Sequence, residues 1–117
     1  MTDIIYRNLT PHPLFIKAQD GEYVTIPPSP DGAARVVYDR LPPEQVRIDG
    51  HEITVAVAGS PREIIGLPDP EEGVALIVAK AVSDAAPASR GDLMSPGKLI
   101  RDEDGTVIGC DGLTRRA

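Results

Sequence analysis

The sequence predicts a mainly β fold, a compact antiparallel barrel or sandwich built from short hairpins with at most one short helix. Twelve prolines and eleven glycines are scattered through the 117 residues, which leaves segments too short for most helices. Several of these segments alternate apolar and polar residues at the two-residue period of a strand. A chain of this length has room for one hydrophobic core, so residues 1–117 are predicted to form a single β-rich domain.

Three hairpins are predicted, each from two strand-like segments around a turn that contains Asp-Gly. This dipeptide accepts the positive φ angles of tight turns. The hairpins join residues 14–17 to 23–26, 46–48 to 52–58, and 99–101 to 106–108.

Residues 34–38 form a further short strand candidate, and residues 74–79 are apolar enough to be a central strand buried on both faces. Residues 79–86 are predicted as a two-turn helix that Pro87 ends, or as a continuation of that strand. The proline clusters at 27–30 and 42–43 are interpreted as rigid loops.

Charge and composition exclude several classes of function. The net charge is −6 and the acidic residues are spread along the chain, which disfavours general nucleic-acid binding. A local basic pocket stays open, with the seven arginines outside the C-terminal pair as candidates. The single Cys110, the lack of a signal-like run and the lack of a long apolar stretch predict a cytoplasmic protein without a membrane span. If a phage encodes the protein, the host cytoplasm is its expected location.

The C-terminal quarter holds the candidate ligand-binding residues. Arg90 and Asp92 are two apart, so they point to one side of an extended segment. Arg101 and Asp102 follow across a short predicted turn at 95–97, so the four charges are expected to meet. A guanidinium fork held by carboxylates grips a phosphate or carboxylate, with His12 as an additional donor. The alternative is a set of structural salt bridges between two loops.

The histidines and the cysteine give little support for catalysis. His12 lies between two prolines, which favours a role in stabilising a turn. A metal site would need His51 to come close to it, and no metal or cofactor is predicted. Cys110 is interpreted as a small buried apolar residue.

Three segments carry a resemblance to a known family: residues 8–13, 66–73 and 90–109. In these segments the chain resembles a family of small uncharacterised proteins of bacteriophages, prophages and actinobacteria. The resemblance implies a phage or mobile-element setting and supplies no catalytic residues. By analogy, small acidic phage proteins of this kind act in counter-defence, as inhibitors of host systems or as sponges for signalling nucleotides.

The leading hypothesis is therefore a non-catalytic binding module for a phosphate-bearing nucleotide signal or a host protein. The second is a structural or assembly protein that forms a homo-oligomer through the edges of its hairpins. The third is a small enzyme that uses His12 and Asp92.

Overall fold

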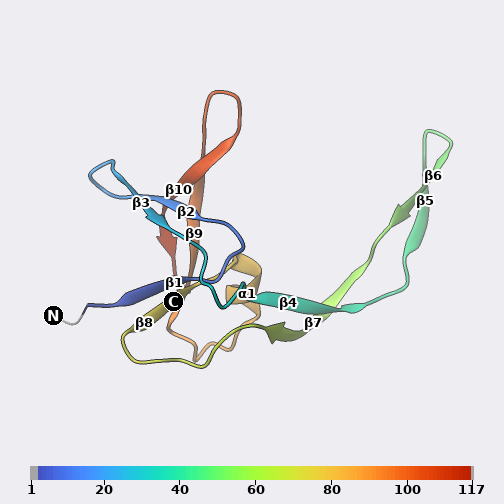
Figure 1. Ribbon diagram of the computed structural model, residues 1–117. Helices are drawn as coiled ribbons and strands as arrows, with labels where there is room; N and C mark the ends of the chain where they lie inside the picture. The colour runs from blue at the N-terminus through green and yellow to red at the C-terminus, as the bar shows by residue number, and fades with distance from the viewer. Residues whose placement is uncertain (1–2, 117) are drawn as a thin grey trace.

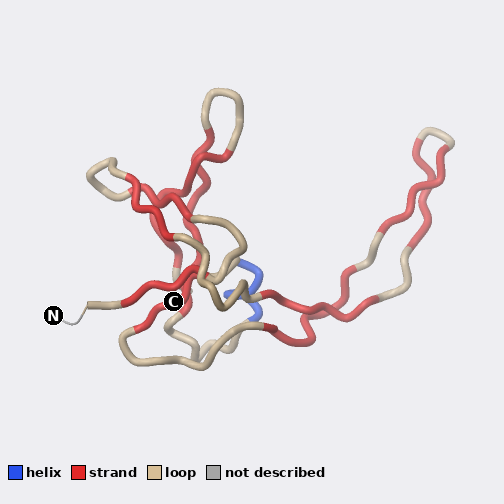
Figure 2. The backbone as a smooth tube through the Cα atoms, in the orientation of Figure 1, coloured by secondary structure: helices blue, strands red, loops and turns tan. Residues whose placement is uncertain are grey.

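The computed structural model describes residues 3–116 and has the mainly β architecture that the sequence predicts (Figures 1 and 2). Residues 1, 2 and 117 of the predicted 1–117 domain lie outside the described range. The elements in chain order are β1 (Ile5–Asn8), β2 (Leu14–Lys17), β3 (Tyr23–Ile26), β4 (Arg35–Arg40), β5 (Glu44–Ile48), β6 (His51–Val55), β7 (Ala58–Ile65), β8 (Val74–Ile77), α1 (Lys80–Ala85), β9 (Leu93–Arg101) and β10 (Val107–Thr114).

Six strands form a barrel-like sheet in the order β1-β8-β9-β10-β2-β3. The predicted hairpins β2–β3 and β9–β10 are antiparallel. The other three pairings are parallel: β1 with β8, β8 with β9, and β10 with β2. The sheet is therefore mixed and not antiparallel as predicted, because strands far apart in the sequence pair in parallel. A parallel bridge from Asn8 to Pro28 joins the two outer edges and almost closes the barrel.

The buried strand predicted at 74–79 is confirmed as β8, which is buried on both faces but ends at Ile77, two residues before Ala79 caps helix α1. Its Ile77 packs inside the barrel with Ile16 and Cys110. Leu76, which points the other way, belongs to a second cluster outside the barrel. The other buried members of that cluster are Leu9, Ala34, Val78, Val82, Ala86 and Leu93. One strand thus connects two small apolar clusters, where the sequence predicts a single core, because successive side chains of β8 point to opposite sides of the sheet.

The helical alternative for residues 79–86 is correct. Helix α1 follows Ala79, which has extended backbone angles, and it ends before Pro87. Val82 lies on its buried side, and Val82 and the C-cap residue Ala86 both belong to the cluster outside the barrel. No helix in the described part of the chain is long and apolar enough to cross a membrane.

Residues 35–65 form an arm that extends away from the barrel (Figure 1, teal to green). At the root of the arm β4 pairs with β7, and Val36 and Ile64 pack against the outer cluster. Farther out β5 pairs with β6, and every residue of these two strands is exposed.

The arm makes the molecule less compact than the sequence predicts. The longest dimension is 62 Å and the radius of gyration is 17.6 Å, against roughly 13 Å for a compact domain of this length. The hairpin predicted at 46–58 is present as β5–β6, but it ends at Val55, and Ala58 already belongs to β7, where it pairs with Arg40. Its location on an exposed arm is the second correction. Alternation of apolar and polar residues predicts a strand, but it does not predict whether the apolar side of that strand packs against the core of the same chain.

Candidate functional site

Arg90 and Asp92 form an ion pair, although they lie in the turn before β9 and not on the extended segment that the sequence predicts. Nε of Arg90 donates to Oδ1 of Asp92 at 3.0 Å, and Nη2 donates to Oδ2 at 3.0 Å. Nη2 also donates to the carbonyl oxygen of Pro68 at 2.9 Å. Three of the five guanidinium N–H donors are therefore used within the protein, and the pair ties the loop before β9 to the loop before β8.

The two side chains of this pair are largely buried, with exposed fractions of 13% for Arg90 and 14% for Asp92. Hydrogen bonding to Asp92 raises the pKa of Arg90 above its ordinary value, although desolvation acts against the shift. Hydrogen bonding to Arg90 lowers the pKa of the Asp92 carboxyl, again against desolvation. Both groups are charged at neutral pH and neutralise each other.

Arg101 and Asp102 lie at the other end of β9 and stabilise the turn of the β9–β10 hairpin. Nη1 of Arg101 donates to the carbonyl oxygen of Gly105 at 2.8 Å. Oδ1 of Asp102 accepts the backbone N–H groups of Asp104 at 2.9 Å and Thr106 at 3.0 Å. These contacts are all local to the turn.

The four charges expected to meet are therefore not brought together. β9 continues through Ser95-Pro96-Gly97, the segment interpreted from the sequence as a turn. At about 3.3 Å per residue, this strand separates its two ends by roughly 25 Å. Gly97 does not form a turn. A glycine is required there because a Cβ would lie 2.3 Å from the carbonyl oxygen of Asp111 on β10.

His12 contributes through its backbone. Its carbonyl oxygen accepts a hydrogen bond from Nδ2 of Asn8 at 2.8 Å, while the residue itself is exposed. His51 lies in the outer hairpin of the arm, and Asp92, the partner of His12 in the enzyme hypothesis, is bound to Arg90. Residues 3–116 contain no group of three or more metal-ligating side chains. Cys110 is buried in the barrel, as predicted.

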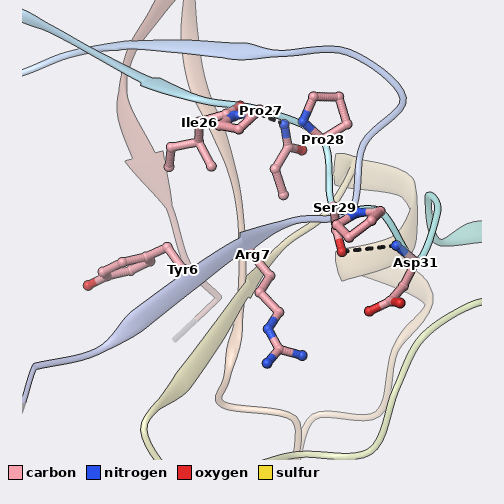
Figure 3. A pocket seen from close by; sticks show the side chains of 9 residues that line it. Tyr6, Arg7, Ile26, Pro27, Pro28, Ser29 and Asp31 are labelled. Carbon is pink, nitrogen blue, oxygen red and sulfur yellow. Dashed lines mark hydrogen bonds between the residues drawn. The ribbon is translucent and has the colours of Figure 1, made fainter.

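Arg7 lines two hollows, and nothing in its sequence context distinguishes it from the other arginines. One hollow, of about 420 Å³, lies between β1 and residues 26–31 (Figure 3). The other, of about 330 Å³, includes residues 66–68. Within the described range, the Arg7 guanidinium forms no ion pair or hydrogen bond with the protein. Asp31 also lines both hollows, which places a carboxylate near any ligand there.

The outer hairpin of the arm has two different faces. Residues paired across an antiparallel hairpin point to the same side, so the register separates the side chains into two sets. One side carries Gln45, Thr54, Arg47 and Glu52, with a hydrogen bond of 3.1 Å between Thr54 Oγ1 and Gln45 Oε1. The other side carries the aliphatic residues, which we call the apolar face: Val46, Ile48, Ile53 and Val55.

The apolar face is open to solvent. The exposed fractions of its four residues are 37% for Val46, 57% for Ile48, 42% for Ile53 and 38% for Val55. An apolar hollow of about 520 Å³, lined by residues 38–41, 43 and 56–58, lies where this hairpin joins β4 and β7. The alternation of apolar and polar residues in this hairpin is visible in the sequence. That the apolar residues are exposed to solvent follows only from the position of the arm in the structure.

Comparison with known proteins gives no relative from which a function can be transferred: the chain matches no family model, no curated protein and no solved structure.

Proposed function

We propose that the protein is a non-catalytic binding module that holds a protein surface with its arm. The observation that carries this proposal is the apolar face of the β5–β6 hairpin, four branched aliphatic residues on one side of a ribbon that extends beyond the core. The binding-module hypothesis thus keeps its general form, while its recognition surface moves from the C-terminal arginines to residues 44–55.

The physical argument concerns the stability of the ribbon. A two-stranded hairpin is marginal in water unless a third strand or a packed layer covers its apolar side. The side chains of β5 and β6 are exposed, and the hairpin lies outside both apolar clusters. A grouped apolar surface of this kind is typical of protein–protein contacts. The covering layer therefore comes from another polypeptide.

The polar side of the hairpin supports the same assignment. Gln45, Arg47, Glu52 and Thr54 are suited to water, and they leave the opposite side as the one that a partner covers. The two sides differ only in side-chain chemistry, because they belong to the same strands. This provides an internal control for experiments.

Site-specific photo-crosslinking in the source cells tests the proposal. A photoreactive side chain at Ile48 lies on the apolar face, whereas the same group at Thr54 lies on the polar face. We expect a protein adduct from position 48 and little or none from position 54. Equal yields from the two positions, or no adduct from either, would contradict the proposal.

A phosphate-bearing nucleotide is the second candidate ligand, and Arg7 favours it. Its guanidinium lines a hollow whose volume of about 420 Å³ is in the range of small-molecule sites. Arg90, in contrast, is held by Asp92 and Pro68. Native mass spectrometry of protein purified from its source is expected to show a nucleotide-sized adduct that Arg7→Ala removes. A bare protein mass for the wild type would contradict this candidate.

The phage or mobile-element setting, and the counter-defence role that goes with it, remain predictions from the resemblance. The identity of the crosslinked partner tests them directly. A component of a host defence system would support the counter-defence role.

A further inference from the structure

We infer that the partner of the apolar face is a second copy of this chain, with the two hairpins stacked face to face about a two-fold axis. This inference rests on the proposed function and specifies the partner. It concerns the side chains of one element, β5–β6, in two copies.

The shape and chemistry of the apolar face fit a copy of itself. The face has no side chain larger than isoleucine and no aromatic or charged group at its centre. Such a surface matches another aliphatic sheet face, because stacked sheets interdigitate their side chains at a spacing of about 10 Å. Two hairpins stacked in this way form a four-stranded sandwich, which provides each ribbon with the packed layer that it lacks.

The order of residues along the face is compatible with two-fold symmetry. The cross-strand pairs form three rows, which from the root of the hairpin to its tip are Glu44 with Val55, Val46 with Ile53, and Ile48 with His51. An axis that crosses the middle row places Val46 and Ile53 over their own counterparts. It also places the tip row of one copy over the root row of the other.

The polar residues of the face favour this antiparallel stack. Glu44 at the root and His51 at the tip are the two polar side chains in the three rows. In the antiparallel arrangement the carboxylate of one copy lies near the imidazole of the other, at both ends of the stack. An imidazole N–H can donate to a carboxylate, so the charge pattern is self-complementary. A parallel stack would instead place each carboxylate near the other carboxylate.

The length of the arm makes the arrangement sterically possible. The hairpin lies far from the barrel along the 62 Å dimension of the molecule (Figure 1). Two copies that overlap only at their hairpins keep their barrels on opposite sides of the stack. A partner that must be present whenever the ribbon folds is most simply the chain itself, which is made at the same time and place.

Sedimentation of the purified full chain tests the inference. We expect a species of twice the 12.5 kDa protomer mass at micromolar concentration. Val46→Lys places two like charges in the middle row and is expected to weaken the dimer by at least about 100-fold. The matched control is Gln45→Lys, next to Val46 in the chain but on the polar side, which is expected to leave the dimer unchanged.

Because Val46→Lys can also disturb the hairpin itself, chemical crosslinking provides a second measurement. Ile53→Cys treated with a short bismaleimide is expected to give a covalent dimer, since the two copies of residue 53 face each other. Thr54→Cys, on the other side of the same strand, is expected to give no covalent dimer after treatment, because the two copies of residue 54 face away from each other. The natural Cys110 is buried in the barrel, so it is not expected to react with the bismaleimide in the folded protein.

The outcomes separate this inference from the proposed function. A monomer at all concentrations without an Ile53→Cys dimer overturns the two-fold stack, and so does a ring or filament larger than a dimer. If photo-crosslinking from Ile48 in cells then captures a different protein, the binding function stands and only the partner is wrong. If it captures nothing, the proposed function also fails.

Discussion

The side-chain amide of Asn8 on β1 donates a hydrogen bond to the carbonyl oxygen of Ile26 at the end of β3, over a distance of 3.0 Å. This bond connects the two outer edges of the six-stranded sheet at the place where the barrel almost closes. Asn8 is 1% exposed. Its Oδ1 also accepts from the backbone N–H of Thr10 at 2.9 Å and from Oγ1 of Thr10 at 2.6 Å. Both N–H groups of this amide donate a hydrogen bond, and its oxygen accepts two.

Asn8→Ala is expected to destabilise the protein by roughly 3 kcal/mol, because it leaves several buried donors and acceptors without partners. Chemical denaturation followed by circular dichroism measures the loss in the free energy of unfolding. Gln45→Ala removes another amide, one that is exposed on the arm, and is expected to change stability by less than about 0.5 kcal/mol. Similar values for the two variants would show that Asn8 does not close the barrel.

Gly97→Ala is expected to cost about 1–3 kcal/mol through overpacking. The new methyl group would lie 2.3 Å from the carbonyl oxygen of Asp111 and 2.9 Å from that of Gly112, so the backbones of β9 and β10 must separate. Gly91→Ala is the matched control, because a Cβ there meets no atom within 4 Å and its φ is not positive. Thermal unfolding compares the two, and an unchanged melting temperature for Gly97→Ala would contradict the close approach.

Gly97 also shows where sequence reasoning reached its limit. Serine, proline and glycine in succession are typical of a turn, and that interpretation brought Arg90 and Arg101 together. In the structure this glycine accommodates the carbonyl oxygen of a neighbouring strand. The requirement for a missing side chain comes from β10, which begins ten residues later. Local sequence therefore could not separate the two explanations.

The elements that were predicted correctly depend on local signals. The hairpins β2–β3 and β9–β10 follow from their Asp-Gly turns, and α1 follows from its alanines and from Pro87. The parallel pairing of β10 with β2 has no local signal, since it joins Cys110 to Ile16 across most of the chain. β1 was missed for a similar reason, because its partner β8 is far away in sequence.

The ion pair of Arg90 and Asp92 predicts a specific dependence of stability on pH. The pKa of Asp92 is lowered in the folded protein, chiefly by its hydrogen bonds with Arg90. Its contribution to stability is then present above the unfolded pKa, near 3.8, and is lost as the pH falls through the lower folded value. We expect Asp92→Asn to be less stable than wild type at pH 7, by roughly 2 kcal/mol. The difference should narrow below about pH 4.

Glu103→Gln is the control for this titration, because Glu103 is an exposed carboxylate in the β9–β10 turn. Urea denaturation at a series of pH values compares the three proteins. A constant difference between wild type and Asp92→Asn over the whole range would contradict the role assigned to the ion pair. A Glu103→Gln protein that follows wild type at every pH would confirm that the effect belongs to Asp92.

The reactivity of Cys110 reports on the opening of the barrel. Its thiol lies inside the barrel, in the cluster with Ile16 and Ile77, and the residue is 3% exposed. A thiol reagent must therefore wait for the barrel to open, so labelling of the folded protein is expected to be more than about 100-fold slower than labelling in denaturant. Asn8→Ala, which loosens the seam of the barrel, should increase the rate. Val46→Lys, on the distant arm, should leave it nearly unchanged. If both variants increased the rate equally, the barrel and the arm would open as one cooperative unit.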